Sequence, residues 1–502
     1  MKLQLIHQKV KTSPPFPNES AACSTQTPGL HKIYREVVLV LGVIVVLVLL
    51  MLIQLMLFPL NHQINKAAQT KSGTEKLARH VGTACADPCS FILVESIPEG
   101  VHFDPNSTRN PSIADSWMKL LREAESSVDI ASFYWTMINN DTKTKEPSAG
   151  QGEAVFKELQ RVSRKLSVRV AVSKPSRTQT SADLTLLQQS GAHVVIVDMP
   201  RLTSGVLHTK FWIVDSRHLY IGSANMDWRS LTQVKELGAI IYNCTCLAED
   251  LKKIFEEYWN ISGRNGTIPS PWASNYSTAY NRESPMQLKF NSTPARVYLS
   301  SSPPALCPEG RTNDLSSILS IIDDAEEFVY VAVMNYIPLK MFSFPRRYWP
   351  AIDDHLRRAA FERKLKVRLL VSCWHYSDPT MFPFLHSLAA LRSHWKPLDV
   401  EVKVFVVPAT REQRKIPYSR VNHNKYMVTD KVAYIGTSNW SGDYFENTAG
   451  VGLVVNQTES RGSSPVPTIA EQLQAVFERD WSSPYSKCMD AADKWHNICK
   501  WI

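Results

Sequence analysis

Two copies of one short residue pattern carry most of the chemistry that this sequence could do. Each copy reads H-x-K-x4-D and is followed by a turn of Gly, Ser or Thr, any residue, and Asn. A lone H-x-K triplet arises by chance in many chains of this length, but six specified positions repeated in register do not. The pattern consists of His208, Lys210, Asp215 and Asn225 in the first copy and His423, Lys425, Asp430 and Asn439 in the second.

A pair of imidazoles with lysines and amides beside them suits the cleavage of a phosphodiester. That reaction needs a nucleophile, an acid for the leaving oxygen, and cationic groups for the non-bridging oxygens. One imidazole cannot occupy both sides of an in-line displacement, whereas two copies that face each other supply one to each side. The duplication therefore predicts a single active site built from both copies.

The segments around the two copies read as strands that would present these side chains. We expect strands at 207–214 and 425–428, each leading through a turn into a second strand at 219–222 or 433–436. Residues i and i+2 of a strand point to the same face. Each histidine and the lysine two positions later would therefore project together.

Internal repetition extends well beyond the catalytic pattern. Residues 164–173 (RKLSVRVAVS) and 363–372 (RKLKVRLLVS) agree at seven of ten positions, which indicates a direct repeat. Such β-branched runs read as buried strands, and helix-like stretches at 152–162 and 351–363 alternate with them. The order predicts an α/β fold with two pseudo-symmetric α/β sandwich repeats, at 96–285 and 286–502, that form one active site.

The N-terminal region predicts a membrane anchor. Residues 37–58 contain no charge over 22 positions, a length that spans a bilayer as a helix and exceeds the apolar run of a cleaved signal peptide. We interpret them as a single transmembrane signal-anchor between a cytosolic tail (1–36) and a lumenal stem (59–95). Basic residues flank both ends, but eight of nine cysteines and nearly all N-x-S/T sequons follow the span, which favours a lumenal body.

The sequons and cysteines predict modifications of that lumenal body. Cys85-x3-Cys89 and Cys244-x-Cys246 could suggest a metal site, but no histidine lies at zinc-finger spacing, so disulfides between the two pairs are preferred. Cys373 and Cys499 are further disulfide candidates, with the connectivity left open. Asn439 also heads a sequon, but a glycan there would block the site. The glycosylation candidates are Asn106, Asn140, Asn243, Asn260, Asn265, Asn275 and Asn291.

Composition adds only weak constraints. With 502 residues, 44% of them hydrophobic, the chain can form two core-containing units. The net charge of +9 permits a polyanionic partner without demanding one, because no basic block concentrates it. Trp135, Trp228 and Trp440 flank the catalytic turns and are interpreted as packing residues rather than as base-stacking ones.

The doubled pattern resembles that of the phospholipase D superfamily. Longer segments resemble its members three and four over nearly the whole predicted lumenal part: LVESIPEG (93–100), GVLHTKFWIVD (205–215), GSANMDWRSLTQVKELG (222–238) and RVNHNKYMVTD (420–430). This resemblance implies that one histidine attacks phosphorus to give a phosphohistidine while the other protonates the leaving alcohol and then activates water. His208 is expected as the nucleophile and His423 as the acid and base.

The same resemblance assigns roles to the remaining residues. Asp215 and Asp430 complete the catalytic motif, although this aspartate more often braces local backbone than touches substrate. Glu236 and Glu446 fit the acids that hold each imidazole in one tautomer. Phosphate oxygens would be bound by Lys210, Asn225, Lys425 and Asn439, so neither a metal nor another cofactor is expected.

The resemblance also implies a lysosomal 5′-to-3′ exonuclease of single-stranded DNA and RNA that releases nucleoside 3′-phosphates. Delivery would pass through the endoplasmic reticulum, Golgi and endosomes as a type II membrane protein, with cleavage of the stem as a route to a soluble form. The alternative is phospholipid hydrolysis or transphosphatidylation by the same phosphohistidine, and an inactive lumenal binding protein is a third hypothesis. The expected partners are single-stranded nucleic acid, a phospholipid under the alternative, the membrane, and a second copy in a homodimer.

Overall fold

The computed structural model describes residues 85–175, 181–392, 398–460 and 466–489, together with Trp495 and Cys499. All of these belong to one compact unit, Gly82–Ile502. The predicted cytosolic tail, the transmembrane span and the stem up to residue 84 lie outside the described residues. Within the described ranges, no helix is long and apolar enough to cross a membrane.

The first half of the described chain forms a mixed seven-stranded sheet. Its strand order is β1-β9-β7-β6-β2-β4-β5, antiparallel from β1 to β2 and parallel from β2 to β5. The end of the predicted stem forms β1, which is an edge strand of this sheet. The strands are β1 (Ser90–Ser96), β2 (Ser127–Ser132), β4 (Ser167–Ser173), β5 (His193–Val197), β6 (Phe211–Val214), β7 (His218–Gly222) and β9 (Glu236–Tyr242).

The second half forms a ten-stranded sheet that contains the same strand order. Its central part runs β11-β20-β19-β18-β13-β16-β17, with the same change from antiparallel to parallel pairing after β13. The remaining strands are β10, β12 and β21. The bounds are β10 (Met286–Phe290), β11 (Thr293–Ser302), β12 (Thr312–Asn313), β13 (Phe328–Val333), β16 (Lys366–Cys373), β17 (Val400–Val406), β18 (Lys425–Thr429), β19 (Val432–Gly436), β20 (Gly450–Asn456) and β21 (Ser486–Cys488).

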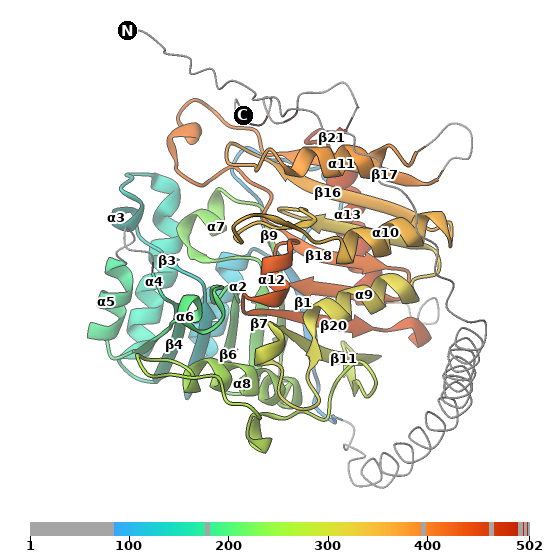
Figure 1. Cartoon of the computed structure of the whole chain (residues 1–502). Helices are drawn as coiled ribbons and strands as arrows, with labels where there is room; N and C mark the ends of the chain where they lie inside the picture. The colour runs from blue at the N-terminus through green and yellow to red at the C-terminus, as the bar shows by residue number, and fades with distance from the viewer. Residues whose placement is uncertain are drawn as a thin grey trace, which may run out of the picture. The chain divides into compact units, whose positions relative to one another are not determined.

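Helices connect the strands and cover the sheets (Figure 1). Two short strand pairs lie outside the main sheets: β3 (Trp135–Thr136) with β8 (Met226–Asp227), and β14 (Leu339–Lys340) with β15 (Arg347–Tyr348). The helices are α2 (Ile113–Glu123), α3 (Asn139–Thr142), α4 (Gly150–Ser163), α5 (Ala182–Gln189), α6 (Met199–Thr203), α7 (Trp228–Thr232), α8 (Thr245–Asn260), α9 (Asp314–Asp324), α10 (Ala351–Phe361), α11 (Met381–Ala389), α12 (Gly442–Glu446) and α13 (Ile469–Ser482). The mixed α/β class predicted from the sequence is confirmed.

Three large clusters of buried side chains make up the core. One lies between the first sheet and helices α2 and α4, and another lies between the second sheet and α9, α10 and α11. The largest joins the two halves, because residues of both sheets pack there with α8 and α13. In α2, burial of Ile113, Trp117, Leu120 and Leu121 follows the spacing of one helical face. The shared central cluster makes the two halves one folding unit.

Direct backbone hydrogen bonds also join the halves, at two similar points. Leu207 pairs with Ala449, and Asn422 pairs with Lys235, as isolated parallel bridges. Next to the second bridge the buried ammonium of Lys235 lies 2.7 Å from Asp480 on α13 and 3.4 Å from Glu95 on β1. Arg479 also contacts Glu95, at 2.6 Å, and the two cations hold the pKa of Glu95 down at about 2 despite its burial. Charge pairing therefore reinforces this junction from both halves.

Disulfides connect the segment before β1 to the start of α8, where Cys244 precedes the helix and Cys246 lies in its first turn. Cys85 pairs with Cys246 and Cys89 pairs with Cys244, so the predicted disulfides between these two pairs are confirmed. The third bridge joins Cys373 at the end of β16 to Cys499. Among the sequon asparagines, Asn106, Asn140, Asn260, Asn265, Asn275 and Asn291 are exposed and Asn243 is half-buried.

A glycine at the junction of the halves gives a stability test. A Cβ at Gly205 would lie 2.8 Å from the Thr448 nitrogen and closer still to the Asn447 carbonyl, which are backbone atoms of the other half. Gly205→Ala should therefore lower the free energy of unfolding by about 2 kcal/mol or more and reduce activity by displacing His208. Thermal unfolding followed by circular dichroism checks the first effect.

The matched control is Gly150→Ala at the start of α4. Gly150 has helical backbone angles, φ −53° and ψ −35°, and a Cβ there meets nothing within 4 Å. Alanine should be neutral or stabilise by about 0.5–1 kcal/mol. Equal melting temperatures for the two variants would contradict the close approach of the halves at Gly205.

Candidate active site

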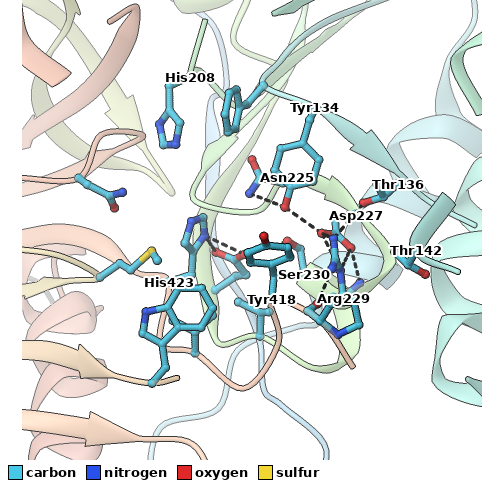
Figure 2. A pocket seen from close by; sticks show the side chains of 18 of the residues that line it. Tyr134, Thr136, Thr142, His208, Asn225, Asp227, Arg229, Ser230, Tyr418 and His423 are labelled. Atoms are coloured by element: carbon cyan, nitrogen blue, oxygen red, sulfur yellow. Dashed lines mark hydrogen bonds and ion pairs between the residues drawn. The ribbon is translucent and has the colours of Figure 1, made fainter. Parts of the chain in front are cut away.

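A cavity of about 540 Å³ lies where the two halves meet, and both motif histidines line it. Figure 2 shows His208 and His423 with Tyr134, Asn225, Asp227, Arg229 and Tyr418 around the same space. The first half contributes Phe133, Tyr134, Thr136, Asp141, Thr142, His208, Asn225, Asp227, Arg229, Ser230, Val234 and Glu236, and the second contributes Met334, Trp374, Pro417, Tyr418, Val421, His423, Asn439 and Tyr444.

The histidines precede their strands rather than lying within them. The strand predicted at 207–214 begins only at Phe211, and β18 begins at Lys425. The physical reason is that the backbone before each strand pairs with the opposite half. The His208 N–H donates to the Ala449 carbonyl at 2.9 Å, and the His423 N–H donates to the Lys235 carbonyl at 2.8 Å. Each imidazole is thus positioned by the repeat to which it does not belong.

His208 is oriented by a neutral acceptor. Its Nδ1 lies 2.9 Å from the backbone carbonyl oxygen of Thr437. A carbonyl only accepts, so Nδ1 carries the proton and Nε2 keeps its lone pair. Burial, together with the nearby Lys210 and Lys425, holds the pKa of His208 well below its usual 6.5. The rings of Phe133 and Tyr444 flank the imidazole, each with its centroid 5.0 Å away. This imidazole is therefore neutral and held in a fixed orientation.

His423 is oriented by a carboxylate. Its Nδ1 lies 2.8 and 3.0 Å from the two oxygens of Glu236, which is fully buried in the first half. The hydroxyls of Ser223 and Ser230 donate to the same carboxylate at 2.6 and 2.9 Å. Burial lowers the pKa of His423, and Glu236 partly offsets that effect. A carboxylate on Nδ1 stabilises the imidazolium and suits an acid and base.

The prediction that Glu446 orients a catalytic imidazole is wrong. Its carboxylate accepts from Trp349 Nε1 at 2.7 Å and pairs with Lys340, and no hydrogen bond to either catalytic imidazole is found in the described structure. Sequence spacing identifies Gly450 as the equivalent of Glu236. Each lies 13 positions after the hydroxyl residue of its turn, Ser223 or Thr437, and each begins the strand that follows. The site therefore has one orienting carboxylate, which acts across the junction.

Both motif lysines are buried, and neither is among the residues that line the cavity. Lys210 Nζ donates to the His208 carbonyl at 2.5 Å, and Lys425 Nζ donates to the His423 carbonyl at 2.8 Å. Each ammonium has three donors, so two remain after this bond. Burial lowers the pKa of Lys425 to about 7 and that of Lys210 well below its usual value. A bound phosphodiester would favour the charged form of both.

The two turn asparagines line the cavity and are held in similar ways. Asn225 Nδ2 donates to the Tyr134 hydroxyl at 3.4 Å, and Asn439 Nδ2 donates to the Tyr444 hydroxyl at 3.1 Å. Each amide nitrogen keeps a second N–H for an anion. Asn439 is buried, with 4% of its surface exposed, which agrees with a sequon that carries no glycan.

Asp215 and Asp430, predicted as part of the catalytic motif, brace backbone instead. Asp215 accepts N–H groups of Glu125, Ser126 and Ser127 at 2.8 to 2.9 Å. Asp430 accepts two N–H groups from the equivalent turn before β13, at 3.0 and 3.1 Å. Neither aspartate is among the residues that line the cavity.

Several cavity residues were not singled out by the sequence pattern. Tyr134 donates to Asp227 at 2.8 Å, and Asp227 pairs with Arg229 at 2.7 Å. The second half contributes Trp374 and Tyr418 to the cavity, and neither residue belongs to a sequence motif. By contrast, Trp135, Trp228 and Trp440 are buried, so their interpretation as packing residues is confirmed.

Comparison with known proteins finds similar sequences over most of the chain. The PLD3/4, PLD-like domain family model matches residues 105–410. The chain is 57% identical over 500 residues to the 5′-3′ exonuclease PLD3 of Xenopus laevis, covering 98% of this chain and 100% of that one. It is 59% identical over 418 residues to the 5′-3′ exonuclease PLD3 of Homo sapiens, covering 83% and 84% of the two chains.

More distant proteins have lower sequence identity to this chain. The 5′-3′ exonuclease PLD4 of Homo sapiens is 51% identical over 409 residues, covering 80% of each chain. Among solved structures, a phosphatidylserine synthase from Haemophilus influenzae matches with a TM-score of 0.50 and 12% identity, covering 75% of this chain and 85% of that one. At that identity the likeness concerns the fold alone.

The asymmetry of the imidazoles predicts unequal effects of two glutamate substitutions. Glu236→Gln removes the charge that holds up the pKa of His423, so that pKa falls further. His423 then loses its proton at a lower pH than in wild type. The alkaline limb of the kcat profile should therefore move to lower pH. We expect kcat to fall roughly a hundredfold or more. Phosphodiester hydrolysis measured across pH tests both effects.

Glu446→Gln is the control for this substitution, and its kcat should stay within about threefold of wild type. Similar losses in both variants, or an unmoved alkaline limb in Glu236→Gln, would disprove the assignment of Glu236 to His423.

The bracing role of Asp215 predicts a loss of stability rather than of chemistry. Asp215→Asn replaces an oxygen that accepts backbone N–H groups, which should cost about 1–3 kcal/mol of unfolding free energy. Below the melting temperature, kcat/KM should stay within about threefold of wild type. A fully folded variant that has lost a hundredfold or more in kcat would show that Asp215 takes part in the reaction.

Proposed function

The chain belongs to the PLD3/4 family of phospholipase D-like proteins, and we propose that it is a 5′-to-3′ exonuclease. It hydrolyses single-stranded DNA and RNA and releases nucleoside 3′-phosphates. The observation that carries this proposal is the pair of buried imidazoles on one cavity, each bonded through Nδ1 and so presenting Nε2 for reaction. Relatives named 5′-3′ exonuclease support the choice of substrate.

Different partners give the two histidines different roles. His208, which has a neutral carbonyl on Nδ1 and two lysines nearby, stays unprotonated and is the nucleophile. His423, which has the Glu236 carboxylate on Nδ1, gains and loses the proton. The two asparagines that line the cavity and the two buried lysines near His208 bind the non-bridging oxygens.

The reaction proceeds in two displacements. In the first, Nε2 of His208 attacks phosphorus, the P–O5′ bond breaks, and O5′ takes the proton from Nε2 of His423. The product strand leaves with a 5′-hydroxyl. In the second, Nε2 of His423 takes a proton from water, the water oxygen bonds to phosphorus, and the P–N bond breaks. A nucleoside 3′-phosphate is released and both histidines return to their starting states.

The site suits an acidic compartment. Because burial and the nearby lysines hold the pKa of His208 well below 6.5, this nucleophile keeps its lone pair at lower pH than an ordinary imidazole does. Glu95 has a folded pKa of about 2, below its ordinary 4.5. Its contribution to stability is therefore complete above about pH 4.5 and is lost as the pH falls towards 2.

These properties fit the lysosomal lumen, which we propose as the site of action. The rest of the proposed topology is a signal-anchor at 37–58 with a cytosolic tail and a lumenal stem, and delivery as a type II membrane protein. We also propose that cleavage of the stem releases a soluble form. Assembly as a homodimer is a further part of the proposal.

A phospholipid is the second candidate substrate, and one observation favours it. The loop between β14 and β15 exposes Phe342 and Phe344, with 69% and 102% of their surfaces accessible. The ring centroid of Phe342 also lies 6.2 Å from that of Tyr444, which lines the cavity. Exposed aromatic residues beside a phosphodiester site could contact a lipid surface.

The test supplies both substrates to the protein at about pH 5 with EDTA. A 5′-hydroxyl single-stranded oligonucleotide and a fluorescent phosphatidyl lipid are assayed in parallel with wild type, His208→Ala and His423→Ala. We expect stepwise release of nucleoside 3′-phosphates, with rates at least roughly a thousandfold lower in both variants. Lipid turnover with an intact oligonucleotide would overturn the nuclease proposal and support the second candidate.

A further inference from the structure

We propose that Tyr418, supported by Tyr376 and Trp374, forms a stacking platform for one nucleobase of the substrate. The base is the second from the 5′ end, on the nucleoside whose O5′ leaves. We call these three residues the aromatic platform. The proposal rests on the proposed exonuclease function and adds the group that positions the leaving strand.

The aromatic platform is continuous with the catalytic cavity. Tyr418 and Trp374 line the cavity with His423, and Figure 2 shows Tyr418 among the labelled lining residues. The rings of Tyr418 and Tyr376 are stacked, with centroids 4.7 Å apart and planes 25° from parallel. Trp374 contacts Tyr376 edge to face at 5.0 Å. The three rings thus form one surface at the cavity.

Two of the three rings of the platform are exposed. Tyr418 keeps 60% of its surface accessible and Tyr376 keeps 48%. Trp374 is 7% exposed, and its Nε1–H is buried without a hydrogen-bond partner within the described ranges. The open ring faces of Tyr418 and Tyr376 match a ligand that has a π face of its own. A nucleobase has one, whereas an acyl chain does not.

The backbone that carries Tyr418 is fixed in an unusual conformation. Tyr418 has a φ of 55° and Arg420 has a φ of 56°, in a region that non-glycine residues seldom occupy. Two buried guanidinium groups hold this segment: Arg229 donates to the Pro417 carbonyl, and Arg420 donates to the Glu99 carbonyl at 2.9 Å. Strained positions persist where the surrounding structure fixes them, and they cluster at ligand sites.

The position of Tyr418 along the chain selects the leaving side of the phosphate. Tyr418 precedes His423 by five residues on one segment, and Val421 between them packs against Trp374. His423 is the group that protonates O5′. The nucleoside attached to O5′ therefore lies nearest the segment that carries Tyr418, while the 5′-terminal nucleoside stays attached through its 3′-phosphate to His208.

The experiment removes the ring and the base separately. Wild type, Tyr418→Ala and Tyr418→Phe are assayed with 5′-hydroxyl oligonucleotides that are intact or carry one abasic site at position 1, 2 or 5, and the first cleavage is followed. With wild type, the abasic site at position 2 should raise KM roughly tenfold, and those at positions 1 and 5 should have smaller effects. Tyr418→Ala should raise KM for the intact strand by a similar factor, while Tyr418→Phe stays near wild type.

The combination of changes decides the assignment. In Tyr418→Ala the abasic site at position 2 should add no further loss, because ring and base are two sides of one contact. Additive losses, or an unchanged KM in Tyr418→Ala, would overturn the platform while leaving the nuclease proposal intact. If His423→Ala degrades the intact strand as fast as wild type does, the proposed function itself fails.

Tyr348→Ala is the matched control. Tyr348 is 63% exposed and is not among the residues that line the cavity. It stacks on Phe384 with ring planes 13° from parallel and centroids 6.3 Å apart, much as Tyr418 stacks on Tyr376. This variant should keep the KM of wild type with every oligonucleotide. A rise in KM equal to that of Tyr418→Ala would show that loss of any exposed aromatic ring weakens binding, and the platform assignment would fall.

Discussion

The exchange of backbone hydrogen bonds between the two halves is the constraint on which the rest of the site depends. The N–H of His208 bonds to Ala449, and the N–H of His423 bonds to Lys235. Each half thus fixes the catalytic residue of the other, and neither half alone could place two imidazoles on one cavity. The close approach at Gly205 and the buried pairing of Lys235 with Asp480 are both consequences of bringing the halves this near to each other.

Within that nearly symmetric frame, one position breaks the symmetry and gives the histidines separate tasks. Glu236 opens β9, whereas its equivalent Gly450 opens β20. A Cβ at Gly450 would already collide with the Ser438 hydroxyl, so a larger side chain has no room there. His208 is left with a neutral carbonyl, and His423 receives a carboxylate. The proposed reaction needs one imidazole that attacks and one that exchanges protons, and this difference suits the two roles.

Much of this arrangement could be predicted from the sequence, because strand patterns and the doubled motif are local signals. The strands predicted at 219–222 and 433–436 agree with β7 and β19. Predictions that depended on contacts between distant segments were weaker. Glu446 was chosen because it lies close to its turn in sequence, whereas counting 13 residues from Ser223 and Thr437 leads to Glu236 and Gly450. Trp374 and Tyr418 are distant in sequence and reach the same cavity only in the folded chain, so no sequence pattern indicates that they belong to the site.

The division of labour between the histidines is the central claim, and covalent trapping tests it most directly. A nucleoside 3′-(p-nitrophenyl phosphate) has a leaving group that departs without an acid, so it can react in His423→Ala. The enzyme is quenched in alkali, which preserves phosphohistidine, and its peptides are analysed by mass spectrometry. We expect the nucleoside phosphoryl adduct on His208 of the His423→Ala variant and none on the His208→Ala variant. An adduct on His423 of His208→Ala, with none on His208 of His423→Ala, would contradict the account.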